Sequence, residues 1–465
     1  MSARSLFDPV IDGGIRNPNW FEGRLLTADA LRDKDRAERI RGRLLGRAIG
    51  AGIFEGLLVT RGAADGGVHK TLNITKGAAI NGEGDTLMLS QDVTVDVVPP
   101  TTPAQPEPKL FGRCEPPPPI ASIPSGFGIY VLVMSPASGY RERAPKSGLG
   151  SEGIVTGCGD AFAVDGVRFR LEKLEPSNIS GIDAARRTEL TQLIAHSEDD
   201  ANRSLLRNLV AHHCFGTPQL TRFPIDPFAM SQGVSDWLSY GALDDLRDLQ
   251  RLTCCDVPIA LLLWNATGVA YLDVWAARRP PVPSPASAMW PLPGGARQSV
   301  EGLARFLQFQ DHLAQIIADS TAPTGIRADH WFRYLPAAGL VPLSGAAKGL
   351  QLSTFFLDVP THLPRPPDYS TADGPVVLEG ARLRLLLQQS FLYEAPQLVA
   401  DVTQRTAFWL YRLRENAFAI NTASGEASTA AIVFATAQMP YLATPRFNVA
   451  RWDYSNFSSS VLGPS

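Results

Sequence analysis

The glycine-rich segment GLGSEG, at 148–153, is the first pattern whose spacing could carry chemistry. It matches GxGxxG, with which a turn between a strand and a helix binds the pyrophosphate of a dinucleotide. That chemistry requires a strand directly before the glycines and a helix directly after them. Here the preceding apolar run ends near Ser135, Pro145 intervenes, and the residues that follow, IVTGCGD, have no helical pattern. We therefore interpret this segment as a loop and predict no cofactor.

Histidine and cysteine side chains offer a second chemistry, zinc binding. His212, His213 and Cys214 are consecutive, and Cys254 and Cys255 form another adjacent pair. Nitrogen and sulfur ligands suit zinc, but paired ligands are usually separated by about two to four residues. Adjacent ligands on a helix would point in different directions. We therefore predict no metal site and interpret the cysteines as small buried apolar residues.

Nucleophilic and acid–base catalysis lack a recognisable arrangement. The sequence contains no GxxxxGK[ST] phosphate loop and no GxSxG nucleophile motif, and its isolated histidines accompany no Ser or Cys motif. The acidic pairs Asp199-Asp200 and Asp244-Asp245 lie in polar, helical segments, which favours solvated helix faces. We predict that the protein is not an enzyme, with no catalytic residues. A glycan hydrolase stays open as an alternative, because the distance between two carboxylates cannot be read from a sequence.

Two aromatic clusters are candidates for recognition of a partner. The first is Trp20, Phe21, Glu22, Gly23, Arg24 and Leu25, and the second is Trp331, Phe332 and Tyr334. Grouped aromatics serve either as anchors in a core or as part of an assembly interface, where aromatic residues and arginine are enriched. We predict that the first cluster is a docking interface and that the second is a possible second interface.

The elements that would position these residues begin with a helix. Thr27 can cap a helix from Ala28 to about Gly46, in which leucines and an isoleucine form an apolar stripe and DKDRAERIRGR a charged outer face. Short segments that alternate or run apolar between glycine and aspartate turns then predict antiparallel strands. These segments are GIFEGLLVT, KTLNIT, DTLMLS, DVTVDVV, GIYVLVMS and FAVDGVRFRLEKL.

The rest of the chain divides into a helical middle and a strand-rich end. Helical spacing covers 182–214, with an acidic break at SEDD, and 298–319; between these ranges VPIALLLW and GVAYLDVWAA predict a β-hairpin turning at NATG. In the last third, the segments LQLSTFFLDV, ARLRLLLQQSFLYEA, AFWLYRLRENAFAIN and AAIVFATA look mostly strand-like. Proline-rich stretches near 99–119 and 280–293 favour surface crossings.

These patterns predict an α+β protein with three domains. Residues 1–174 would form a helix and β-sandwich shoulder domain, and 175–320 a helical middle domain with a β-hairpin insertion. Residues 321–465 would form a β-rich distal domain. No fixed internal period occurs, which makes a solenoid or propeller an unsuitable interpretation.

Composition excludes several classes of protein. The chain has 465 residues, 46 acidic and 43 basic, with a net charge of −3, so it offers no basic stripe for nucleic acid. Its 45% hydrophobic and 19% charged content excludes disorder for most of its length. No apolar run is long enough to span a membrane, so we expect no direct membrane insertion. Five cysteines without a paired framework fit synthesis in a reducing cytoplasm.

A resemblance covers NWFEGRLLTADALRDKDRAERIRGRLLGRAIGAGIFEGLLVT and GAAINGEGDTLMLSQDVTVDVV. This stretch resembles the start of a group of bacterial proteins found with phage-tail-like contractile injection systems. More distantly, it is similar to the N-terminal shoulder of the type VI secretion baseplate adaptor. The matching positions are Trp20, Glu22, Gly23, Leu25, Leu26 and Thr27. DVPIALLLWNATGVAYLDVWAARR and HWFRYLPAAGLVPL look like later segments of the first group.

The resemblance implies a structural, oligomeric part of a tail-like particle. The adaptor's shoulder anchors it on the baseplate, and its chain forms a trimer. We therefore expect baseplate or other tail subunits as partners, a homotrimer, and synthesis in the bacterial cytoplasm followed by assembly into the particle. Two features depart from the adaptor: DALRDKDRAER replaces its glutamine-rich helix, and the last third has no match to its distal head. A receptor- or glycan-binding tail protein, with Trp275, Trp290 or Trp331 as a platform, remains the alternative.

Overall fold

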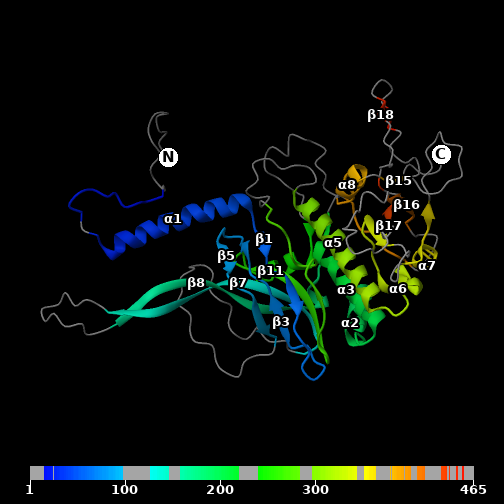
Figure 1. Cartoon of the computed structure of the whole chain (residues 1–465), viewed down its shortest axis with the longest axis horizontal. Coiled ribbons are helices and arrows are strands. Elements are labelled where there is room, and N and C mark those ends of the chain that lie inside the picture. Colours follow the sequence, from blue (N-terminus) through cyan, green and yellow to red (C-terminus); the bar gives the residue numbers. More distant parts are fainter. Residues whose placement is uncertain are drawn as a thin grey trace, which may run out of the picture.

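The chain folds as a mixed α+β protein with several small sheets, shown in Figure 1. The computed structural model describes residues 15–24, 26–97, 126–145, 158–218, 239–282, 296–342, 350–362, 377–378, 380–391, 393–399, 406–413, 431–436, 439, 447–448 and 453–454.

The N-terminal helix α1 (Ala28–Ile49) begins where the sequence predicts. The Thr27 side chain accepts a hydrogen bond from the Ala30 amide, and Asp29 lies in the first turn, near the positive end of the helix dipole. The helix ends at Gly50, whose φ of 99° suits glycine. It therefore runs three residues beyond Gly46, which the sequence suggested as its end. In Figure 1, α1 projects to the left of the body.

Two three-stranded antiparallel sheets follow α1. One has the order β1 (Gly52–Gly56), β4 (Gly77–Ile80), β5 (Thr86–Leu89). The other has the order β2 (Val59–Arg61), β3 (Thr71–Ile74), β6 (Val93–Asp96). The sequence predicted strands at the positions of β1, β2, β3, β5 and β6, with β1 and β2 as one segment, but it did not predict β4.

A four-stranded antiparallel sheet forms the middle layer, in the order β12-β11-β7-β8. Its members are β7 (Gly128–Pro145), β8 (Cys158–Leu174), β11 (Val257–Asn265) and β12 (Gly268–Asp273). The β11–β12 hairpin was expected as an insertion in the helical middle. Instead, β11 pairs with β7 from Val257↔Met134 to Trp264↔Gly128, so the hairpin completes a sheet begun by the N-terminal part.

Both faces of this sheet are buried, and successive residues along a strand belong alternately to the core on one face and to the core on the other. On β7, Ile129, Val131 and Val133 belong to the core shared with the helices. Tyr130, Leu132 and Met134 belong to the core shared with the two small sheets. This double burial explains why β7 and β11 read as near-continuous apolar runs rather than as polar–apolar alternation.

Helices cover the other side of the sheet. The predicted acidic break separates α2 (Ala184–Ala195) from α3 (Asp200–Phe215), and the Asp183 and Asp199 side chains cap the two helices. The short α4 (Ala242–Asp248) and the long α5 (Ala296–Asp319) pack near α3. Short helical turns also occur at η2 (Pro176–Asn178), η5 (Pro323–Gly325) and α6 (Ala328–Trp331).

The last third contains one five-stranded sheet. Its path is β13-β17-β16-β14, with β15 also paired to β16. The bounds are β13 (Ala338–Pro342), β14 (Thr361–His362), β15 (Val377–Leu378), β16 (Phe408–Leu413) and β17 (Ala431–Thr436). Two-residue pairs also form between β9 (Thr217–Pro218) and β10 (Ser239–Tyr240), and between β18 (Phe447–Asn448) and β19 (Asp453–Tyr454).

Two segments predicted as strands in this third are helices instead. LQLSTFFLDV contains α7 (Leu352–Phe355), and ARLRLLLQQSFLYEA contains α8 (Gly380–Ser390). In α8, Leu383 and Leu386 are buried and Leu385 is exposed, which is helical rather than strand spacing. Its leucine, arginine and glutamine residues are also good helix formers, so local propensity and burial agree.

Candidate docking surface

The N-terminal arm, defined here as residues 15–49, contains the predicted docking cluster. The Trp20 and Phe21 side chains are 45% and 65% exposed, and Glu22, Gly23 and Arg24 are exposed beside them. The Arg24 guanidinium lies 5.3 Å from the centroid of the Trp20 ring and 6.0 Å from that of Phe21. Leu25, the last member of the predicted cluster, lies outside the described residues. The structure thus brings two aromatic rings and a cation together on the surface.

Apolar side chains continue along α1 and are exposed. They are Leu26, Leu31, Ile40, Leu44, Leu45 and Ile49. Leu26 and Leu45 are 67% and 68% exposed, whereas the buried positions of the helix are the small residues Ala30, Ala37 and Gly46. These exposed side chains make the arm a candidate surface for association.

Most of the predicted charged face of α1 is exposed, including Lys34, Asp35, Arg36, Glu38 and Arg41. Two arginines of the charged stretch bind the body. Arg43 donates to both carboxylate oxygens of Asp85, at 2.7 and 2.9 Å, and this pairing raises the pKa of Arg43. Arg39 approaches Asp165 on β8 at 3.4 Å. These polar contacts attach the helix to the body, while its leucines Leu31, Leu44 and Leu45 are exposed.

Close backbone packing fixes the base of the arm. A Cβ atom on Gly46 would lie 2.2 Å from the carbonyl oxygen of Gly84, in the turn between β4 and β5. Gly42, one turn earlier, has no neighbour within 4 Å of such an atom. The sequence pattern suggested Gly46 as a helix breaker. No local pattern distinguishes Gly46 from Gly42, because the close contact depends on a turn that is distant in the sequence.

The β7–β8 hairpin lies beside the arm and also exposes apolar residues. Tyr140, Phe162 and Val164 are about half exposed on its outer part. The Arg39–Asp165 ion pair joins α1 to this hairpin, and Figure 1 shows both elements projecting to the same side. The sequence predicted a strand at 162–174 but not the continuation of β7 from Pro136 to Pro145, nor this exposure, because alternation along a strand does not tell which face meets the core.

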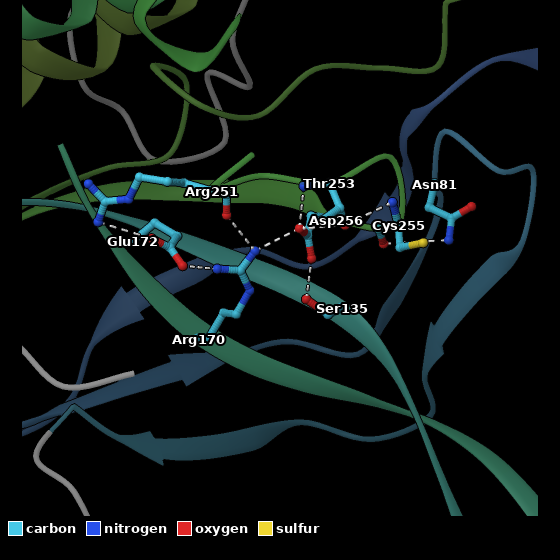
Figure 2. A network of polar contacts seen from close by, with 8 residues as sticks. All are labelled: Asn81, Ser135, Arg170, Glu172, Arg251, Thr253, Cys255 and Asp256. Atoms are coloured by element: carbon cyan, nitrogen blue, oxygen red, sulfur yellow. Dashed lines mark hydrogen bonds and ion pairs between the residues drawn. The ribbon is translucent and has the colours of Figure 1, made fainter. Parts of the chain in front are cut away.

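A buried polar network holds the inner part of the hairpin, as Figure 2 shows. Arg170 on β8 binds Glu172, and its Nη2 donates to Asp256 Oδ2 at 2.6 Å. Asp256 also accepts from the Ser135 hydroxyl on β7 at 2.5 Å, and from the Thr253 hydroxyl and amide at 2.8 and 2.7 Å. This network ties both hairpin strands to the loop before β11.

The charges of this network are balanced. Arg251 Nη2 lies 3.2 Å from Glu172 Oε2, so two guanidinium groups face two carboxylates. Burial raises the pKa of Glu172, against the opposing effect of Arg170 and Arg251. Every carboxylate is engaged by a cation or a hydrogen-bond donor. The arrangement is therefore suited to positioning the hairpin rather than to proton transfer or nucleophilic attack.

The possible second interface is not available as predicted. Phe332 is 0% exposed and packs at 5.2 Å from the Phe309 ring and 5.0 Å from the His312 ring, within the core. Trp331 is partly buried against the same core. Tyr334 stacks on His212 at a centroid distance of 3.5 Å. The sequence left two roles open for this cluster, a core anchor or an interface, and the structure packs these side chains as core anchors.

The candidate zinc ligands are likewise occupied or buried. Cys214 is a buried free thiol, and Cys254 donates to Glu83 at 3.0 Å. Cys255 is disulfide-bonded, which departs from the expected unpaired cysteines. Burial lowers the pKa of His212 and lowers that of His213 to about 4. Within the described ranges, no three His, Cys, Asp or Glu residues group as a metal site.

The carboxylate pairs considered for catalysis have structural partners. Asp199 caps α3 and Asp200 pairs with Arg203. Asp244 pairs with Arg247 and Arg297, and Asp245 accepts a hydrogen bond from the Ser180 amide at 2.9 Å.

The tryptophans considered for glycan binding do not form an exposed platform where they are described. Trp275 and Trp331 are partly buried, and Trp290 lies outside the described residues, as does the 148–153 loop. Among the described helices, none combines the length and apolar character needed to cross a membrane. The chain matches no family model. A search of curated proteins also finds no significant match.

Proposed function

We propose that this protein is a structural, non-enzymatic subunit of a phage-tail-like contractile injection machine. The N-terminal arm would dock on the baseplate or on a neighbouring tail protein, and the chain would act as a homo-oligomer, for which we propose a trimer. Two features support this proposal: the resemblance of the N-terminal sequence to proteins of such systems, and the exposed apolar side chains of the N-terminal arm.

The observation that carries the proposal is the exposure of the arm's apolar side chains. Trp20, Phe21, Leu26 and Leu45 lie on one continuous stretch of chain and are between 45% and 68% exposed. Large aromatic and aliphatic anchors that become buried inside a rim of polar groups dominate the binding energy of protein interfaces. Arg24, beside the two rings, would supply part of that rim.

The arm is also held in one orientation before it meets a partner. The Gly46–Gly84 contact and the paired Arg43 and Asp85 side chains attach the end of α1 to the body. A preformed binding surface loses less conformational entropy on association than a flexible one. This supports a role in assembly, where subunits must meet in a defined geometry.

A matched pair of leucine variants tests the docking role. Leu45→Gln in α1 removes an apolar group from the arm, and Leu385→Gln makes the same change on α8, where the leucine is 51% exposed. Glutamine keeps a good helix propensity, so neither variant should unfold its helix. We expect Leu45→Gln to lower co-sedimentation with tail particles from the host, and its combination with Phe21→Ala to lower it at least tenfold.

The control should co-sediment like the wild type. Light scattering after size-exclusion chromatography should report an oligomer for the wild type and for both variants if the arm contacts other subunits. Dissociation of the oligomer by the arm variant alone would instead identify the arm's partner as a second copy of this chain. A monomeric wild type that does not co-sediment with particles would contradict the proposal.

A further inference from the structure

A cavity of about 1000 Å³ lies where the end of α1, strand β1, the loop before β11 and helix α5 meet. Its size is at the upper end of the range for small-molecule sites. We propose that this cavity binds a small organic anion, with a carboxylate or phosphate head and an apolar body. The site is separate from the exposed apolar surface of the N-terminal arm and needs no partner protein.

The body of such a ligand would meet apolar walls. The cavity is lined by aliphatic residues from several elements, among them Leu243, Leu252, Val257, Pro280, Val282 and Val300. An apolar lining with a few converging charged groups is typical of sites that bind amphipathic small molecules. A wholly inorganic anion would leave this apolar surface without a contact.

The carboxylates in the lining are already paired with other groups. Asp256 belongs to the Arg170 network. Asp244 pairs with both Arg247 and Arg297, and Glu301 accepts from Arg297 Nε at 3.0 Å. Among the described lining residues, none of these carboxylates hydrogen-bonds to the part-buried cation Arg279.

Arg279 is the group that points to an anion. Its Nη1 donates to the carbonyls of Trp275 and Arg278, and its Nη2 donates to that of Ala276. A guanidinium has five N–H donors, so Nε and one Nη2 hydrogen remain for another acceptor. Among the described residues, no carboxylate hydrogen-bonds to Arg279. A largely buried cation without a directly bound counterion is costly unless an anion joins it.

Further positive charge surrounds this position. The Arg279 guanidinium lies 5.0 Å from the Phe215 ring centroid, and that of Arg305 lies 5.7 Å from the same ring. Burial lowers the pKa of both arginines, with nearby Glu301 partly opposing the effect. Arg47, in the last turn of α1, adds an exposed cation at the cavity lining. The local excess of positive charge favours an anionic ligand.

Cys254 provides a local reporter of binding. It is a free, exposed thiol that lines the cavity. Burial and the bond to Glu83 raise its pKa to about 11, so its reaction with a maleimide is slow enough to follow at pH 8. The Cys254→Ser variant is the control, because any maleimide modification that it still shows comes from another cysteine.

The experiment compares octanoate, octyl phosphate and octanol as probes, at concentrations below micelle formation. We expect one or both anions to slow the modification of Cys254 at least fivefold, while octanol has little effect. The anion that protects Cys254 more strongly shows whether the site prefers a carboxylate or a phosphate head group. Equal protection by octanol, or no protection by either anion, would overturn the proposal.

Two arginine variants test the recognition of the head group. Arg279→Gln should weaken protection at least tenfold, but it also removes bonds that brace the 275–278 turn. Arg47→Gln changes an exposed residue and should weaken protection about threefold without a structural effect. Arg41→Gln removes the same charge from the same helix outside the cavity and serves as the control. If the anionic probe slows the modification of Cys254 equally in the Arg47→Gln and Arg41→Gln variants, the assigned site is wrong.

Discussion

Replacement of Gly46 by alanine should detach the base of the N-terminal arm. The added Cβ atom would lie 2.2 Å from the Gly84 carbonyl oxygen, whereas ordinary contacts begin at 3.4 Å. The obstacle is backbone, not a flexible side chain. Hydrogen bonds hold this turn in place, since the Gly84 amide donates to the Asn81 carbonyl and the Asp85 amide to the Asn81 side chain. The end of α1 would therefore have to shift outward by about 1.2 Å.

This shift affects a strong polar contact as well as packing. Overpacking of a close contact costs about 1–3 kcal/mol. Loss of the two hydrogen bonds between Arg43 and Asp85 adds about 1–3 kcal/mol, since they are charged and partly buried. Alanine returns about 1 kcal/mol through its higher helix propensity. We expect a net loss of about 1–5 kcal/mol for the attachment of α1.

Gly42→Ala is the matched control, because it makes the same change in the same helix. No atom lies within 4 Å of the added methyl group, so only helix propensity acts. This variant should stabilise α1 by about 0.5–1 kcal/mol. Hydrogen exchange of the α1 amides measures the free energy of local opening for both variants. Proteolytic cleavage within the arm provides a second measurement.

Opposite signs for the two variants are the expected result. Faster exchange in Gly46→Ala should be confined to α1 and the β4–β5 turn, because the rest of the body does not depend on this contact. If both alanines slow exchange by the same amount, α1 does not pack against the Gly84 turn, and the preformed orientation that supports the docking proposal is lost.

Two further predictions concern buried charge. Burial lowers the pKa of His213 from 6.5 to about 4, so between these values the unfolded chain binds a proton that the folded chain does not. The free energy of unfolding should therefore fall as the pH drops through this window. His213→Asn should make the decrease between pH 7 and pH 5 smaller by about 2 kcal/mol. Urea denaturation at pH 7 and at pH 5 measures this difference. Asp256→Asn leaves Arg170 with an incomplete set of counterions and should cost about 3–5 kcal/mol, whereas Arg251→Gln, at the network's partly exposed side, should cost less than about 1 kcal/mol. Equal denaturation midpoints for these two variants would show that the network does not hold the hairpin.

Local patterns predicted much of the secondary structure. Thr27 marked the start of α1, and the acidic break at 197–200 separated α2 from α3, because caps act within a few residues of the helix end. The strands at 128–135 and 257–264 were also predicted. Their misassignment to different domains has a simple cause: pairing of β7 with β11 depends on contacts between residues far apart in sequence.

The predicted docking cluster was identified by residue type, but its surroundings were not. Trp20 and Phe21 are exposed, while Phe332, with the same aromatic character, lies in the core. Sequence composition treats these residues alike, because hydrophobicity does not report which elements will cover a side chain. The cavity around Arg279 was missed for the same reason, since its lining comes from separated segments of the chain.

By itself, the sequence determined the mixed α+β class, the approximate starts of α1, α2, α3 and α5, and the strands of the middle sheet, since these follow from capping, periodicity and apolar runs. Only the tertiary structure decided that α1 presents its leucines outward. Gly46 meets Gly84, Arg43 and Arg39 reach acidic residues on other elements, and the buried apolar side chains of the helix are the small Ala30 and Ala37, so its larger apolar side chains stay exposed. Such contacts join residues that no local pattern connects, and they leave the apolar surface of the arm exposed.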